Sequence, residues 1–185
     1  MIPLIRCTPP NERQHAPLRE HLDTILIHRI GIGTRAADVV HAFTGGVPDA
    51  ARVTGYKMPY HFVVEADGTC VQCLSLAYQG PHARKWNGRS IGIAAIGDFR
   101  IHAPPAVQWR SAVLLSALLA YPQGWAIMGH DAAPEGSSDA AKKCPGDKWV
   151  MEDFRDAVAE ASLRTIDVTT SGLRCGASLT PALRN

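Results

Sequence analysis

The segment TILIH, residues 24–28, is a short apolar run that ends in a histidine. Its β-branched residues favour a buried strand. A second run of this kind, WAIMGH, ends in His130. Because ligands of open α/β sheets gather at the ends of strands, the two runs predict that His28 and His130 face a common cleft.

Strand and helix patterns alternate along the rest of the chain. Asp67-Gly68 between two apolar runs is typical of a hairpin, and Gly45-Gly46 marks the end of an amphipathic helix. The order of patterns predicts one α/β domain, in which helices flank both faces of a central, mostly buried, mixed β-sheet. The further elements expected are a helix at 34–43, a hairpin at 59–73, a strand at 90–97, and helices at 106–120 and 147–163.

The length of 185 residues suits one domain with short extensions. We expect an N-terminal extension at 1–23, the domain at 24–164 and a C-terminal tail at 165–185. The tail is expected because the periodicity is lost there and Ser, Thr and Gly accumulate. We expect a monomer.

Composition argues against several classes of protein. A hydrophobic share of 46% and a charged share of 19% are typical of a soluble globular chain. The net charge is only +2 and no basic run exceeds Lys142-Lys143, so nucleic acid is not an expected partner. No apolar stretch reaches about 18 residues, which argues against membrane insertion. The N-terminus lacks the pattern of a secretory signal, so we expect synthesis in the cytoplasm.

Cys144 lies in the polar segment AKKCPGDKW, where a structural cysteine would have little apolar surface to bury. Lys142 and Lys143 are expected to lower the pKa of its thiol. Two imidazoles and one thiolate suit Zn²⁺ and leave a fourth tetrahedral position for water, so we expect one catalytic zinc ion held by His28, His130 and Cys144. The alternatives are hydrogen-bonded histidines and a free loop thiol.

The other cysteines do not suggest a framework of disulfides, because their total is odd and their spacing irregular. Cys70 and Cys73 have the C-x-x-C spacing of many zinc sites. They lie in a strand-like run, however, where positions i and i+3 face opposite sides. A structural zinc ion at this pair is therefore not expected. The five cysteines are Cys7, Cys70, Cys73, Cys144 and Cys175.

Five segments, taken in order, resemble the zinc amidases that include phage lysozyme-type endolysins, bacterial N-acetylmuramoyl-L-alanine amidases and peptidoglycan recognition proteins. They are ILIH at His28, PYHFVVEADG at Tyr60, GPHARKWNGRSIGI at His82, GH at His130 and KKCPGD at Cys144. The resemblance covers about residues 24–163. It implies hydrolysis of the amide that joins N-acetylmuramic acid to L-alanine, with peptidoglycan as the partner and zinc-bound water as the nucleophile.

The resemblance also assigns roles to residues around the metal. It implies that Tyr60 and Lys142 are catalytic, and either group can stabilise the oxyanion that forms on the attacked carbonyl. The alternatives are an aromatic ring that packs at a strand start and a solvated charge. Muropeptide-recycling amidases of the same family have aspartate and glutamate where this chain has Cys144 and Ala94, which favours the lysin and recognition-protein branch.

The segment HARKWNGRS precedes the strand at 90–97, where members of the family line a groove for glycan and peptide. The resemblance implies that His82, Arg84, Trp86 and Asn87 bind substrate, with Arg for the carboxylates of the stem peptide and Trp for stacking on sugar. The alternative is a loop anchored by Trp86 with solvated charges. No role is assigned to three further histidines, which are His41, His61 and His102.

The function expected from these residues is that of a peptidoglycan amidase, and a phage or prophage endolysin is the most natural setting for a chain without an export signal. An antibacterial effector amidase exported by a secretion machine is an alternative. A non-catalytic peptidoglycan recognition module is a second alternative, which Cys144 disfavours. A zinc hydrolase for a different amide is a third, because a fold does not fix its substrate.

Overall fold

The computed structural model describes residues 4–6, 16–17, 21–44, 58–134 and 143–170. Its centre is a six-stranded mixed sheet with the strand order β1-β4-β3-β5-β2-β6. β3 and β4 form an antiparallel hairpin, and every other neighbouring pair is parallel. The strands are β1 (Leu4–Arg6), β2 (Thr24–Ile30), β3 (Phe62–Val64), β4 (Cys70–Gln72), β5 (Ser90–Ile96) and β6 (Ala126–Gly129).

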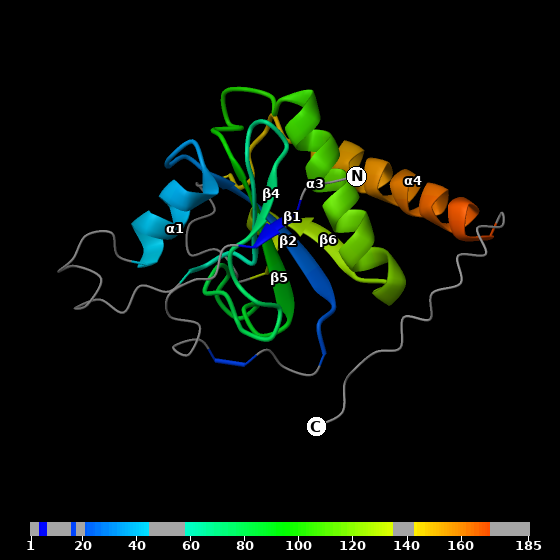
Figure 1. Cartoon of the computed structure of the whole chain (residues 1–185), viewed down its shortest axis with the longest axis horizontal. Helices are drawn as coiled ribbons and strands as arrows, with labels where there is room; N and C mark the ends of the chain where they lie inside the picture. The colour runs from blue at the N-terminus through cyan, green and yellow to red at the C-terminus, as the bar shows by residue number, and fades with distance from the viewer. Residues whose placement is uncertain (1–3, 7–15, 18–20, 45–57, 135–142, 171–185) are drawn as a thin grey trace.

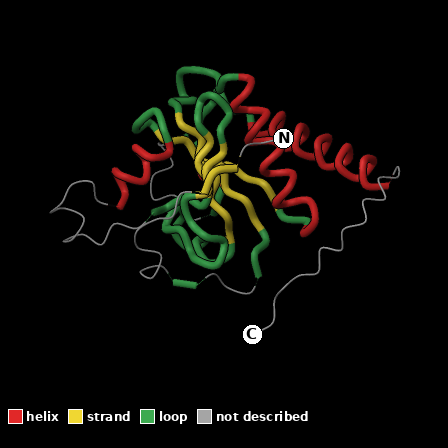
Figure 2. Tube along the Cα trace, viewed as in Figure 1, coloured by secondary structure: helices red, strands yellow, loops and turns green. Residues whose placement is uncertain are grey.

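Helices lie on both sides of the sheet (Figures 1 and 2). α1 (Ala36–Thr44) covers one face, and α3 (Ala106–Ala120) packs with α4 (Met151–Thr170) over the other. The single α/β domain with a buried mixed sheet is therefore confirmed. Two short 3₁₀ turns, η2 (Tyr121–Gln123) and η3 (His130–Ala132), flank β6.

Side chains of β2 alternate between the two faces, as the pleat of a strand requires. Ile25 and Ile27 pack into the core beneath α3 and α4. Leu26 and Ile30 belong to the clusters on the opposite face, as does Ala94 of β5, the register partner of His28. The strand is buried on both faces because parallel neighbours and helices enclose it.

The expected hairpin is confirmed at β3 and β4, with Gly68 at a φ of 86° in its turn. The helix expected at 106–120 is also confirmed with the same bounds. Two cysteines of this region lie on opposite faces of the sheet: Cys70 packs in the cluster beneath α3, and Cys73 in the cluster beneath α1. Both are free thiols, as expected from their spacing.

The last helix begins at Met151, so the expected start at residue 147 is wrong. The chain first makes a turn in which the Trp149 N–H donates to Gly146 O, and this turn buries the Trp149 ring in the core. α4 then continues to Thr170, into the segment expected to be tail. At the other end, β1 lies within the expected N-terminal extension yet pairs with β4. Within the described residues, no helix combines the length and apolar character needed to cross a membrane.

Four aromatic rings join α3, α4 and the loops that precede these two helices, on the side of the sheet away from α1. Trp149 lies 4.9 Å from Phe99, 5.0 Å from Trp109 and 5.3 Å from Phe154, measured between ring centroids. Phe154 is 0% exposed and also meets Trp109 edge-on at 5.0 Å. Aromatic clusters of this kind contribute much of a core's burial energy.

Phe154→Ala should lower the free energy of unfolding by about 3–5 kcal/mol, because it leaves a cavity at the centre of the aromatic cluster. Urea unfolding followed by far-UV circular dichroism measures this loss. Leu118→Ala on the outer face of α3 is the matched control, since Leu118 is 60% exposed and its truncation should change stability by less than about 0.5 kcal/mol. Equal losses in the two variants would contradict the assignment of the core.

Candidate metal centre

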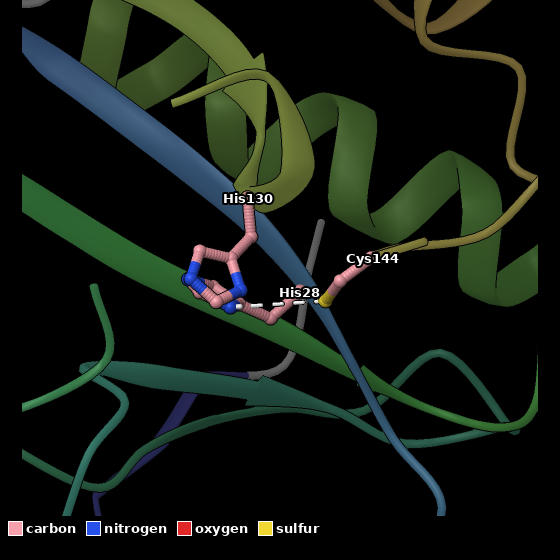
Figure 3. A group of neighbouring side chains, drawn as sticks. All are labelled: His28, His130 and Cys144. Atoms are coloured by element: carbon pink, nitrogen blue, oxygen red, sulfur yellow. Dashed lines mark hydrogen bonds between the residues drawn. The ribbon is translucent and has the colours of Figure 1, made fainter. Parts of the chain in front are cut away.

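The register of the central strands places two histidines side by side. β2 and β6 are parallel neighbours, and Ile27 pairs with Gly129. The residues that follow this pair, His28 and His130, therefore lie together near the carboxyl ends of their strands, and their ring centroids are 4.5 Å apart. His130 directly follows β6, whereas β2 continues past His28 to Ile30, so the expected end of that strand at His28 is wrong. The predicted meeting of the two histidines is seen directly in Figure 3.

Cys144 reaches the same place on a loop that is held by hydrogen bonds to both strand ends. The Asp131 N–H donates to Cys144 O at 2.9 Å, and the Arg29 side chain donates from Nε to Lys143 O at 3.5 Å. The backbone N–H of Arg29 points at the sulfur itself, at 3.5 Å. These contacts fix both the carbonyl and the thiol of Cys144 relative to His28 and His130.

Gly146 secures the far side of this loop. Its φ is 121°, and a Cβ added there would lie 2.5 Å from the Phe99 carbonyl carbon and 2.6 Å from its oxygen. Glycine is therefore required both by the backbone angle and by the close approach of the turn at 98–100. The Lys148 N–H donates to Phe99 O at 2.8 Å and completes the attachment.

The three candidate ligand atoms surround one point. Cys144 Sγ and His28 Nδ1 are 3.9 Å apart, and the ligand atoms of His28, His130 and Cys144 all lie within 4.8 Å of one another. In a tetrahedral zinc site, bond lengths of about 2.3 Å to sulfur and 2.0 Å to nitrogen put those two atoms about 3.5 Å apart. The spacing and the donor types therefore fit a zinc ion with an open fourth position.

Burial sets the protonation of these groups in the protein alone. It lowers the pKa of His28 well below its usual value, and the neighbouring His82 and His130 add to this effect. His28 is consequently neutral, which is the form that binds metals. Burial also raises the pKa of the Cys144 thiol, against the opposing effect of Arg29.

The prediction that neighbouring lysines lower the pKa of Cys144 is wrong for the protein alone, because desolvation of the half-buried thiol outweighs nearby positive charge. The Lys143 ammonium is directed at Asp147, at 2.6 Å, and its side chain is 58% exposed. Lys142 lies outside the described residues. A bound metal ion would lower the pKa of Cys144 instead, since a coordinating thiol is deprotonated outright.

Tyr60 lies beside this cluster, just before β3. Its ring centroid is 5.2 Å from that of His28, and Phe43 of α1 packs against it edge-on at 6.0 Å. Burial raises the pKa of Tyr60 to about 12, and the nearby Cys144 adds to the rise. The hydroxyl therefore keeps its proton at neutral pH and can act as a hydrogen-bond donor.

The residues expected to bind substrate occupy different environments. His82 is buried against His28, whereas Arg84 is exposed. Trp86 donates from Nε1 to Pro134 O at 2.8 Å, and the Arg89 guanidinium covers its ring at 4.7 Å. Asn87 Oδ1 accepts from the Ala83 N–H at 2.7 Å, which closes the loop on itself. Their role in binding substrate stays a prediction.

Two residues at the site carry contacts that the sequence patterns did not assign. Arg29 holds the cysteine loop, and its position next to His28 is the signal that could have indicated this. His61 is fully buried; its Nδ1 accepts from the Gly92 N–H at 3.0 Å, and its Nε2 lies 2.9 Å from Tyr78 O. These bonds fasten the segment before β3 to β5 and to the loop that follows β4.

A family model described as N-acetylmuramoyl-L-alanine amidase, Amidase_2, matches residues 13–147, which is more than half of the chain. The chain belongs to this family. The resemblance seen in the sequence is thus confirmed. It covers the segments that carry His28, Tyr60, His82, His130 and Cys144.

Curated relatives of this family member include peptidoglycan-recognition proteins of insects. One from Drosophila melanogaster is 30% identical over 91 residues, which are 47% of this chain and 47% of the relative. Peptidoglycan-recognition protein 2 of Holotrichia diomphalia is 39% identical over 49 residues, or 26% of each chain. The matched region spans about half or less of these relatives.

Solved structures share the fold at low sequence identity. The amidase LysC from Clostridium intestinale URNW is 17% identical with a TM-score of 0.62, over 86% of this chain and 99% of LysC. Drosophila PGRP-LB is 19% identical with a TM-score of 0.61, over 82% and 92% of the two chains. AmpD is 21% identical with a TM-score of 0.61, over 85% and 95%.

Thiol labelling tests the environments of the cysteines. Cys70 should stay unmodified by iodoacetamide at pH 8 in the folded protein, because burial raises its pKa to about 12. Cys144, whose pKa is also raised, should react more slowly at pH 8 than a free cysteine and faster as the pH increases above 9, since the thiolate is the nucleophile. Peptide mass spectrometry measures both rates.

The fully denatured protein is the control, in which both thiols should react alike. Modification of Cys70 as fast as Cys144 in the folded state would contradict the burial that the structure shows. Zinc at one equivalent should protect Cys144 and leave Cys70 unchanged.

Proposed function

We propose that this protein is a zinc-dependent peptidoglycan hydrolase that cleaves the amide between N-acetylmuramic acid and L-alanine. The observation that carries the proposal is the convergence of His28, His130 and Cys144, whose ligand atoms lie within 4.8 Å of one another. Membership of the amidase family supports the choice of reaction. One zinc ion per chain would be held by these three residues.

A zinc ion in such a site polarises a carbonyl and lowers the pKa of water to about 7. The chain's own residues supply the rest. Tyr60 remains protonated, because its pKa is about 12, and its hydroxyl can donate a hydrogen bond to the oxygen of the attacked amide. Lys142 is proposed as a second, cationic stabiliser of that oxygen.

Peptidoglycan is the proposed substrate because proteins of this fold bind its fragments. A mutant form of Drosophila PGRP-LB was solved in complex with tracheal cytotoxin, and so was the ectodomain complex of PGRP-LCa and PGRP-LCx. Arg84 is proposed to meet carboxylates of the stem peptide. Trp86 can offer only the ring face that Arg89 leaves open.

The proposed setting is a phage or prophage endolysin. Two of the structural neighbours are named as endolysins, and one of these comes from bacteriophage Ph2119. The competing function is a recognition module without catalysis, which the curated peptidoglycan-recognition relatives favour. The complete set of His, His and Cys favours the enzyme, because a binding module has no need of a metal site with an open position.

Purified protein should release new L-alanine amino termini from cell walls without releasing new reducing ends. Cys144→Ser should abolish this release and lower the zinc content below one ion per chain, because it removes the thiolate ligand. His102→Ala, a change at an exposed and unassigned histidine, is the control and should retain activity. Wall binding with no released amino termini from the wild-type protein would establish the recognition module instead.

Tyr60→Phe should reduce kcat by about 10²–10³-fold while the zinc content stays at one ion per chain, because only the donor hydroxyl is lost. Amino-terminal release at saturating wall concentration measures this effect. Tyr121→Phe is the matched control, since Tyr121 is 46% exposed and remote from the cluster. An unchanged kcat for Tyr60→Phe would remove Tyr60 from the mechanism.

A further inference from the structure

A buried hydrogen bond links His28 to a second histidine behind it. His28 Nε2 and His82 Nδ1 are 3.1 Å apart, and the two rings meet edge-on with an interplanar angle of 89°. His28 is 1% exposed and His82 is 7% exposed. Water therefore has little access to this contact, and each nitrogen depends on the other for a partner.

The two nitrogens of His28 have different neighbours, and this fixes where its proton lies when it binds a metal. Nδ1 faces Cys144 Sγ at 3.9 Å, on the side where the ligand atoms converge. A neutral imidazole that gives the lone pair of Nδ1 to a metal carries its proton on Nε2. Nε2–H can then donate to His82 Nδ1, which must be the unprotonated nitrogen of its own ring.

The surroundings of His82 hold its ring in place for this contact. Gly92 of β5 has no side chain, and a Cβ added there would lie 2.8 Å from the His82 ring carbon Cγ. The backbone N–H of His82 donates to Gly80 O at 2.8 Å. His82 Nε2 is buried without a hydrogen bond of good geometry in the described part of the chain, although the ring also interacts with the main chain of Ser90. The well-formed side-chain bond of this ring is the one to His28.

We propose that His82 is a positioning residue for the metal centre, which accepts the Nε2–H of His28 and thereby aims His28 Nδ1 at the zinc ion. The proposal rests on the zinc site of the proposed function. It replaces direct contact with substrate as the main role of His82, because a side chain buried against His28 has little surface to offer a ligand. Outer-shell partners of this kind orient ligand rings and increase their basicity.

Zinc affinity tests the proposal without using activity. His82→Phe keeps an aromatic ring but removes the acceptor, and it should raise the Kd for zinc about 10–100-fold in a chelator competition. His82→Asn keeps an acceptor oxygen near the position of Nδ1 and should recover most of the wild-type affinity. The d–d absorption of cobalt-substituted protein should shift in His82→Phe and resemble the wild type in His82→Asn.

Thermal unfolding with and without zinc separates a positioning role from a packing role. The Tm without zinc measures the loss of packing in each variant. If His82 acts through His28, zinc should raise the Tm of His82→Phe less than it raises the Tm of the wild type. Gly92→Ala provides a second route, because it retains His82 but crowds its ring, and it too should weaken zinc binding.

Two results would overturn the positioning role of His82, and a third would refute the proposed function. Wild-type zinc affinity and cobalt spectrum in His82→Phe would overturn the positioning role. Equal loss of affinity in His82→Phe and His82→Asn, matched by equal loss of zinc-free stability, would also overturn it and leave a packing role. Absence of zinc binding by the wild-type protein would instead refute the proposed function.

Discussion

The parallel pairing of β2 with β6 is the constraint on which the rest of the site depends. β2 is enclosed by β5 on one side and β6 on the other, and hydrogen bonding in both ladders fixes its register. His28 belongs to the strand and His130 follows its neighbour, so their separation is set by backbone geometry rather than by side-chain packing. A pair of imidazoles held in this way needs little reorganisation to accept a metal ion.

The third ligand comes from outside the sheet and needs a different kind of support. The Cys144 loop crosses the open end of the strands, and its attachments are made to main-chain groups of Arg29, Asp131 and Phe99. Gly146 permits the closest of these approaches. The loop is thus positioned by backbone contacts to elements that already hold the histidines, which couples the placement of the sulfur to the folding of the sheet.

Much of this arrangement could be predicted from the sequence. Apolar runs that end in histidine indicate strands whose last residues share an edge, and the separate faces of Cys70 and Cys73 follow from the period of a strand. The direction of the His82 side chain could not be predicted, because it depends on how the loop at 82–89 folds back over the space that Gly92 leaves on β5. The sign of the Cys144 pKa shift also required the structure, since neighbouring lysines are visible in the sequence but desolvation is not.

The alternation of side chains along β2 restricts the sequence changes that this strand can tolerate. Leu26, His28 and Ile30 face one side of the sheet, while Ile25 and Ile27 face the other. Replacement of one apolar residue by another can be absorbed by local repacking. Insertion or deletion of a single residue between Thr24 and His28 would instead turn the imidazole toward α3 and bring isoleucine to the metal side. The fold therefore constrains the length of this strand more tightly than the identity of its apolar residues.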